Sequence, residues 1–353
     1  RPQMTPALTE ARLSNGQAAG AALHWLSLVL VLAAAAFVSA AAGRFHIPLA
    51  DIWQILGRWL SGMAAPETME ERILINVRLP RILLAAIVGA GLALCGAALQ
   101  ALFRNPLVSP RVLGLSSGAA LGGTLTLLVG GSAAMLFAAT FASALTALVL
   151  VAAISHVAGR SILSIVLAGI VIDALFSAMI SLTQYVADPE TSLPAIVFWL
   201  MGSFSSSSWQ KVVEHGPVIL VAIALLYRLR FRIAVLSMGE EEARSFGVNV
   251  GFSRWLVFTV ISVIIGGCVA VSGVIGWVGL VIPHAARLLV GESHRRFHGT
   301  AALLGASFMV TVDTLARTVT SAELPLGILT AVIGAPVFIY LLCTRQTRGG
   351  PAR

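Results

Sequence analysis

Long apolar segments constrain this chain more than any other feature. A helix that crosses a bilayer needs about 20 consecutive apolar residues, and inside the bilayer its backbone must satisfy its own hydrogen bonds. Ten segments are candidates for such helices: 22–42, 79–103, 112–130, 133–156, 162–186, 212–229, 254–274, 276–291, 300–318 and 324–343. The eighth segment is short and contains Pro283, His284 and Arg287. The sequence therefore predicts an all-α membrane protein with about ten transmembrane helices.

The composition agrees with a membrane setting. Of the 353 residues, 58% are hydrophobic and only 11% are charged, whereas soluble domains carry about 25% charged residues. A soluble fold of this length would leave a large surface without polar cover. This excludes an ordinary soluble enzyme, a disordered chain and a nucleic-acid-binding module, so the net charge of +8 is interpreted as a topology signal.

The distribution of basic residues predicts the orientation. With ten spans and both termini on one side, that side carries 15 of the 23 Lys and Arg residues, Arg111 among them, and the other side carries seven. The positive-inside rule then puts both termini in the cytoplasm. We expect cytoplasmic tails at 1–21 and 344–353, a membrane domain at 22–343, a periplasmic loop at 43–78 and a cytoplasmic segment at 239–250. The first apolar run exceeds the core of a signal peptide, which favours an uncleaved helix.

A weak internal repeat suggests two halves. Leu92–Gly114 and Val269–Gly291 align without gaps at four positions, with an offset of 177 residues, which is half the chain. Five spans per half is an odd number, so the two copies would lie inverted in the bilayer, a recurrent plan among transporters. Chance similarity between helices rich in Gly and Ala is the alternative.

Several kinds of site are excluded by what the sequence lacks. The only lysine, Lys211, follows Gln210, so the Gly-Lys-Ser/Thr of a phosphate-binding loop cannot occur. The three cysteines lie in apolar segments and have no metal-ligand spacing. We find no catalytic constellation and expect neither a cofactor nor a metal on this chain.

Ionisable residues at membrane depth are candidates for function because their burial is costly. Asp173 lies in the middle of the fifth span, as a packing aspartate, a cavity wall or a proton relay. Asp313 and Arg317 are four residues apart in the ninth span, which places them on one helix face within reach of an ion pair.

The cytoplasmic segment between spans six and seven has a helical signature. Three acidic residues suit the positive N-terminal end of a short helix, and Gly247 suits a left-handed cap at its end. A connecting segment without further function and a docking surface for a cytosolic partner both fit this pattern. The residues are Glu240, Glu241, Glu242, Ala243, Arg244 and Gly247.

Six motifs occur in a characteristic order between residues 70 and 342. They are Arg78-Leu79-Pro80-Arg81, Phe103-Arg104-Asn105-Pro106-Leu107, Leu113-Gly114-Leu115-Ser116-Ser117-Gly118, Glu242-Ala243-Arg244 through Gly247, Gly279-Leu280-Val281-Ile282-Pro283-His284, and Glu323-Leu324-Pro325-Leu326-Gly327 with Gly334-Ala335-Pro336. Together they resemble the permease subunits of the FecCD-type family of ABC transporters, which import iron chelates and vitamin B12.

The resemblance implies a whole assembly in the bacterial inner membrane. It implies a type II ABC importer permease fold with two inverted five-helix halves, paired with a second permease subunit that we expect to be identical. Two cytosolic ATPase subunits would bind ATP and Mg, and a periplasmic binding protein would deliver the ligand.

The resemblance also assigns roles to residues. Arg78, Arg81 and Arg317 would dock glutamates of the binding protein. The segment from Glu240 to Val248 would be the coupling helix that sits in a cleft of the ATPase. The gate and path would include Ser161, Ile162, Leu163, Ser164 and Asp173, although some relatives carry a polar pair where this chain has Ile162 and Leu163.

The leading hypothesis is therefore a permease, without enzymatic activity of its own, that imports an iron chelate such as a ferric siderophore or haem. Vitamin B12 or an oxyanion is the alternative ligand within the family. An ion-coupled secondary transporter using Asp173 is the alternative from another class. An intramembrane enzyme lacks any nucleophile–base or metal set.

Overall fold

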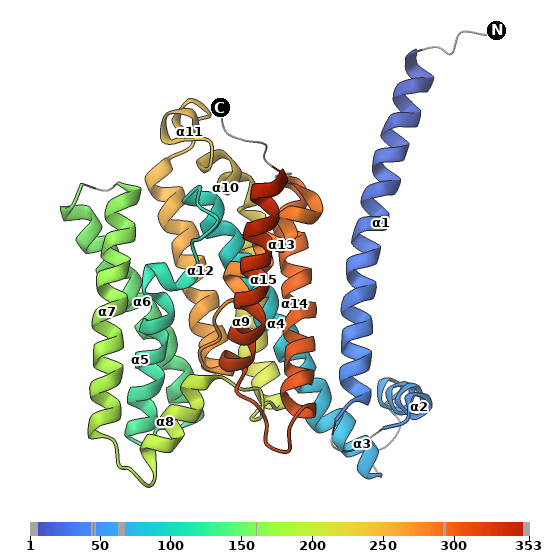
Figure 1. Cartoon of the computed structure of the whole chain (residues 1–353), viewed down its shortest axis with the longest axis vertical. Helices are drawn as coiled ribbons and strands as arrows, with labels where there is room; N and C mark the ends of the chain where they lie inside the picture. Colours follow the sequence, from blue (N-terminus) through green and yellow to red (C-terminus); the bar gives the residue numbers. More distant parts are fainter. Residues whose placement is uncertain are drawn as a thin grey trace.

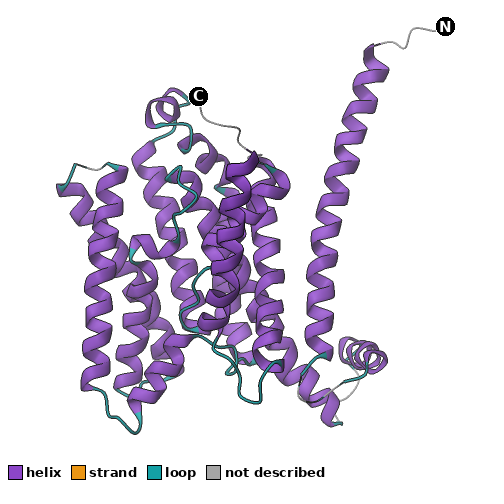
Figure 2. Cartoon of the chain, viewed as in Figure 1, coloured by secondary structure: helices purple, strands orange, loops and turns teal. Residues whose placement is uncertain are grey.

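The computed structural model is helical throughout the part of the chain it describes, residues 6–43, 45, 47–62, 68–159, 161–291 and 294–348, and no strand occurs there (Figure 2). Figure 1 labels the helices. They are α1 (Pro6–Ala41), α2 (Leu49–Leu60), α3 (Met69–Ile73), the π-helical turn Leu74–Arg78, α4 (Leu79–Leu102), the 3-10 turn Pro110–Leu113, α5 (Leu115–Leu128), α6 (Ala133–Val157), α7 (Ile162–Val186), α8 (Ser192–Met201), α9 (Trp209–Arg228), α10 (Arg230–Leu236), α11 (Glu240–Ser245), α12 (Val250–Ser272), α13 (Val278–Val290), α14 (His294–Thr318) and α15 (Leu326–Arg348).

All ten predicted spans coincide with helices, so the prediction of an all-α membrane fold is confirmed. The matching helices, in chain order, are α1, α4, α5, α6, α7, α9, α12, α13, α14 and α15. Among the described residues, seven helices are long and apolar enough to cross a membrane. The apolar helices α5 and α13, with 14 and 13 residues, are shorter.

The centre of the fold is built from helices that approach closely at glycines. α4 and α12 are the most buried spans, and α4 packs against α14, α13 and α9. A Cβ atom on Gly96 of α4 would lie 1.9 Å from the carbonyl oxygen of Gly279, and one on Gly89 would lie 2.2 Å from that of Gly305. Only glycine permits such backbone contact, which is how membrane helices pack without a hydrophobic driving force.

The two short helices lie in opposite halves of the molecule. In Figure 1, α4 rises toward the face that carries α11, and the chain then turns back so that α5 runs down from mid-height. In the other half, α12 descends and α13 then runs up. This arrangement agrees with inverted halves. The ungapped repeat alignment does not hold in detail, because Pro106 lies in the loop after α4 whereas its counterpart Pro283 lies inside α13.

The described part of segment 43–78, which joins the first two spans, includes short helices. It contains α2, α3 and the π-helical turn that leads into α4. Thr68 and Glu71 form a capping box, in which the Glu71 N–H donates to Thr68 Oγ1 at 3.3 Å and the Thr68 N–H donates to Glu71 Oε2 at 3.4 Å. These local signals lie within a polar stretch that hydropathy alone does not separate from a loop.

The helical ends reach further than the predicted membrane domain. α1 begins at Pro6, within the predicted tail 1–21, and α15 ends at Arg348, within the predicted tail 344–353. Residues 1–5 and 349–353 of these tails lie outside the described residues. The start of α1, the end of α15 and α11 all lie on one face of the molecule (Figure 1).

Candidate functional site

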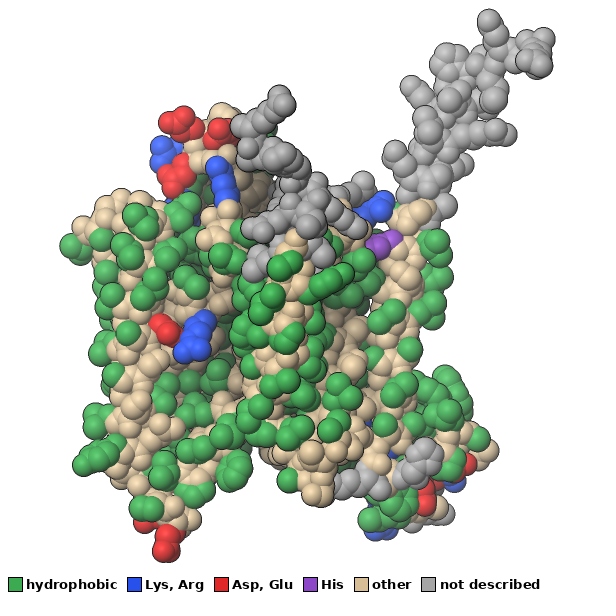
Figure 3. Space-filling model, in the orientation of Figure 1, with side chains coloured by type: hydrophobic (Ala, Val, Ile, Leu, Met, Phe, Trp, Pro, Cys, Tyr) green, Lys and Arg blue, Asp and Glu red, His purple; other side chains and the backbone are tan. Residues whose placement is uncertain are grey.

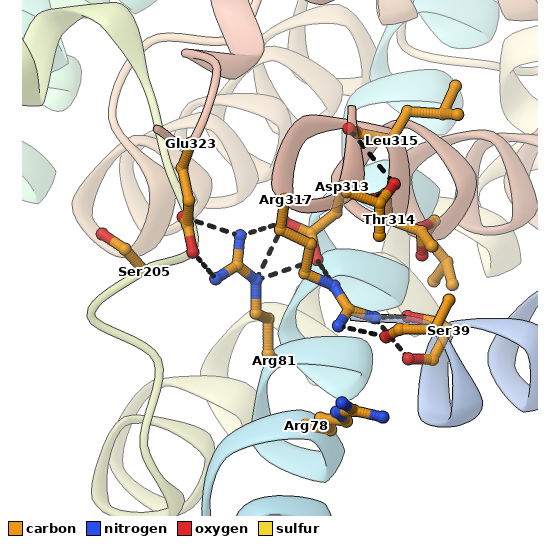
Figure 4. Close-up of polar contacts among 12 residues, drawn as sticks. Ser39, Arg78, Arg81, Ser205, Asp313, Thr314, Leu315, Arg317 and Glu323 are labelled. Atoms are coloured by element: carbon orange, nitrogen blue, oxygen red, sulfur yellow. Dashed lines mark hydrogen bonds and ion pairs between the residues drawn. The ribbon is translucent and has the colours of Figure 1, made fainter. Parts of the chain in front are cut away.

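A network of buried charges connects α4 with α14 and the loop before α15 (Figure 4). The guanidinium of Arg81 donates to both carboxylate oxygens of Asp313 at 2.9–3.0 Å and to those of Glu323 at 3.0 and 3.1 Å. Arg81 and Asp313 are 6% and 1% exposed. A planar guanidinium that meets two carboxylates in this way fixes the angle between the helices that carry them.

Two further arginines hold the C-terminal end of α1. Arg78 donates to the carbonyl oxygens of Ala40, Ala41 and Phe45, the bond to Ala41 measuring 2.9 Å. Arg317 donates to the carbonyl oxygen of Ala42 at 2.6 Å, and to the carbonyl and hydroxyl oxygens of Ser39. The last carbonyls of a helix lack partners within it and carry partial negative charge, so these cations anchor α1 to α4 and α14.

The structure places the three predicted docking arginines together on the face opposite α11, but buried. Arg78, Arg81 and Arg317 are 4%, 6% and 8% exposed, and each is bonded within the chain. The expected Asp313–Arg317 pair has an N–O distance of 3.9 Å, while Asp313 lies closer to Arg81, at 2.9 Å. Docking of a binding protein by these residues stays a prediction.

The cytoplasmic segment has the predicted helix and cap. α11 begins at Glu240, and Gly247 adopts a left-handed φ of 73°. The Gly247 N–H donates to the Arg244 carbonyl at 2.9 Å and the Val248 N–H to the Ala243 carbonyl at 3.0 Å, which is the bonding of a glycine-capped helix end. Ala243 is fully buried, so its side chain packs α11 against the membrane domain.

Charge interactions fix the start of α11 against α12. Glu240 accepts a hydrogen bond from Arg254 at 2.6 Å and lies 3.6 Å from Arg244. The hydrogen bond from Arg254 lowers the pKa of Glu240 below its ordinary value. These three residues, with His156 and Trp255, line a cleft of about 480 Å³ beneath α11.

The predicted gate segment forms the start of α7. The Ser164 N–H donates to the Ser161 hydroxyl oxygen at 3.0 Å, the two hydroxyl oxygens lie 2.8 Å apart, and Ser164 Oγ donates to the Ala158 carbonyl at 2.7 Å. The serines therefore cap the helix. Ile162 is half-buried and Leu163 is 66% exposed, so an apolar side chain projects from the chain at this end.

Asp173 has a partner that the sequence analysis assigned to the wrong place. Arg111 was counted among the cytoplasmic loop residues, but it lies in the 3-10 turn before α5, with its Nε 3.6 Å from Asp173 Oδ2. The chain re-enters after α4, so this loop reaches the middle of α7. Both residues line a cavity of about 230 Å³, together with Ser116, Ser177 and Trp277.

A second cavity was missed altogether. It measures about 590 Å³, and its lining includes Lys211, His215, Ser206 and Glu323. The Lys211 ammonium donates to Ser206 Oγ at 2.7 Å. The uniqueness of this lysine was the available signal, but only the folded chain shows which residues surround it.

These features define a class of protein. The chain is a multi-span membrane protein with small residues at its helix crossings, a re-entrant loop carrying a charge into the membrane region, and a short helix on one face, which is the construction of a transport permease. It belongs to the FecCD transport family, whose model matches residues 30–344. The recognised resemblance is thereby confirmed.

Individual relatives share most of the chain. The molybdate import system permease protein MolB of Haemophilus influenzae is 43% identical over 325 residues, covering 92% of this chain and 96% of MolB. The hemin transport system permease protein HmuU of Yersinia pestis is 38% identical over 286 residues, covering 79% of this chain and 85% of HmuU. A solved metal-chelate type ABC transporter in an inward-facing conformation is 41% identical with a TM-score of 0.82, covering 90% of this chain and 98% of that chain.

Proposed function

We propose that this chain is the permease subunit of an ATP-driven importer in a bacterial inner membrane, with α11 and both termini in the cytoplasm. Its membership of the FecCD family carries this proposal. Lys211, the only lysine, cannot belong to a phosphate-binding loop, so this chain cannot bind ATP in that way. Two cytosolic ATPase subunits therefore bind ATP and Mg in the proposed assembly. A second copy of the chain completes the path, and a periplasmic binding protein supplies the ligand.

The proposed ligand is an iron chelate, a ferric siderophore or haem. A metal-chelate type transporter shares the fold at 41% identity, and HmuU is named for hemin transport. A molybdate-type oxyanion is the second candidate, because MolB is 43% identical over nearly the whole chain. Uptake of radiolabelled ferric siderophore, haem, molybdate and cobalamin into proteoliposomes, with the ATPase subunits and the binding protein, decides between them.

ATP dependence is tested in the same preparation. We expect uptake to require ATP and to survive collapse of ion gradients. Uptake that continues without ATP and stops with the gradients would instead support a secondary transporter using Asp173. Such a transporter would leave the acidic helix α11 without a role.

The coupling role belongs to Glu240, Glu241, Glu242, Ala243, Arg244 and Gly247. α11 is held by Ala243 and by the Glu240–Arg254 hydrogen bond, and Phe246 is 64% exposed, which leaves the outer side of the helix available to a cytosolic partner. We expect Glu240→Lys/Glu241→Lys/Glu242→Lys to abolish transport while ATP hydrolysis by the complex continues. Wild-type uptake by this variant would contradict the assignment.

The docking role belongs to Arg78, Arg81 and Arg317. Because their side chains bond within the chain, glutamates of a binding protein would have to compete for them. The positive charge of the cluster would still attract an acidic partner over a distance, an effect that acts on the association rate and falls with salt. We expect Arg317→Glu to slow association of the binding protein at low ionic strength; an unchanged rate in correctly folded protein would reject docking at this cluster.

A further inference from the structure

One charged side chain lies exposed at mid-depth of the membrane domain. Arg111 is 76% exposed on its side chain, and its ion-pair partner Asp173 lies near the middle of α7. Figure 3 shows an adjoining basic and acidic group at mid-height, on a face that is otherwise largely apolar at that level. An arginine at the bilayer centre costs at least about 2.5 kcal/mol when it faces lipid, so this face borders water or protein.

The Arg111–Asp173 pair is loose. Its N–O distance of 3.6 Å exceeds that of a hydrogen bond, and Asp173 Oδ1 is buried without a hydrogen-bond partner among the described residues. The cavity beside the pair is also lined by Ser109, Ser116 and Ser177. The guanidinium therefore lies beside a largely apolar cavity that carries several serine hydroxyl groups, and its loose contact with Asp173 leaves it exposed.

We propose that Arg111 binds negatively charged oxygens of the ligand as it passes, and that Asp173 competes for the guanidinium and so allows release. This rests on the proposed import function. A guanidinium binds oxyanions and carboxylates through paired hydrogen bonds, and conduction requires binding that is weak enough to reverse. The ligand class is an oxyanion such as molybdate, or a ferric chelate with anionic oxygens.

The first test measures the electrostatic potential of the cavity without any ligand. Ser177→Cys is made in a Cys343→Ser background, where Cys95 and Cys268 are buried. Its rates of reaction with an anionic and a cationic methanethiosulfonate are compared. We expect Arg111→Gln to lower the anionic-to-cationic rate ratio about tenfold, as loss of a unit charge nearby in a medium of intermediate dielectric predicts. Asp173→Asn should raise the ratio.

Arg232→Gln provides the matched control, because Arg232 is exposed on α10. It should leave the ratio unchanged. A ratio that is the same in the Arg111→Gln, Asp173→Asn and unsubstituted proteins would overturn the proposal. In the double variant Arg111→Gln/Asp173→Asn the two charge changes oppose each other, so its ratio should lie between those of the two single variants.

The second test measures transport of two ligands that carry anionic oxygens. In proteoliposomes containing the ATPase subunits and the binding protein, Arg111→Gln should lower uptake of molybdate or of an anionic ferric tris-catecholate about tenfold, as loss of a charge-assisted hydrogen bond predicts. ATP hydrolysis stimulated by the binding protein should persist. Unchanged uptake overturns the proposal. Absence of ATP-driven uptake by the unsubstituted complex would reject the proposed function. The thiol reaction rates would still show whether Arg111 makes the cavity favour anions.

Discussion

Arginines in this chain differ in role because their surroundings differ. Arg81 is 6% exposed and meets two carboxylates, so its charge is compensated within the fold. Arg111 has one distant carboxylate and an exposed side chain. The first is suited to holding helices together and the second to meeting a ligand, although both occupy the apolar part of the sequence.

Arg81→Ala should destabilise the protein strongly. It leaves Asp313, 1% exposed, without its nearest cation, and removal of one partner of a buried ion pair costs about 3 kcal/mol or more. We expect a lower melting temperature and a lower monodisperse yield in detergent, measured by fluorescence-detected size exclusion. Arg232→Ala, at an exposed position of α10, is the control. Equal melting temperatures for the two variants would show that the ion pair between Arg81 and Asp313 contributes nothing to stability.

The sequence revealed only part of the charged network. Asp313 and Arg317 were paired from their spacing of four residues on one helix, and that pair exists at 3.9 Å. The closer partner, Arg81, is 232 residues away, and helical periodicity carries no information about contacts over such separations. Arg111 was misplaced for a related reason: a charge count assumes that loops stay outside the membrane, and this loop re-enters.

Whole elements were predicted where apolar length decides them. The ten spans were found because a bilayer imposes a minimum length, and α11 because its acids and Gly247 follow capping rules. α2, α3, α8 and α10 were not predicted. They are short, so they depend on tertiary contacts in addition to local signals such as the Thr68–Glu71 capping box of α3.

The crossing of α4 and α13 provides a test of close packing. In a helix interior, Gly→Ala normally stabilises by about 1 kcal/mol. At Gly96 the new Cβ would lie 1.9 Å from the Gly279 carbonyl oxygen, whereas at Gly216 in α9 the nearest atom is 3.8 Å away. We therefore expect Gly96→Ala to lower the melting temperature and Gly216→Ala to leave it equal or raise it. A change of melting temperature with the same sign in both variants would refute the close contact between Gly96 and Gly279.

The attachment of α11 should depend on pH. The hydrogen bond from Arg254 lowers the pKa of Glu240 below its ordinary 4.5, so its stabilising effect is complete above pH 4.5 and is lost as the pH falls through the lowered pKa. Below that point, we expect faster hydrogen exchange at residues 240–248, after correction for intrinsic rates. Glu240→Gln should show the faster exchange at neutral pH as well. Glu241→Gln, which removes no ion pair seen among the described residues, should not.

At the scale of the whole molecule, the exposed surfaces indicate an incomplete path. A cavity lined in part by Arg111 and Asp173 lies in the chain, and Leu163 is exposed at the start of α7, where the gate is proposed. A gate formed by one short segment needs a partner across the path. The homodimer proposed for this chain supplies that partner as a second Leu163.

Leu163→Cys in the Cys343→Ser background should therefore form a disulfide between two copies in native membranes under mild oxidation. The expected product has twice the mass of the chain, and its formation should block ATP-driven uptake until a reductant is added, because the crosslink holds the gate closed. Leu30→Cys on α1 is the matched control, since Leu30 is 58% exposed and apolar like Leu163, which is 66% exposed. α1 lies at the edge of the molecule (Figure 1) and should give monomer. Monomer from both variants, or a crosslink only to a different permease, would exclude a homodimer closed at this segment.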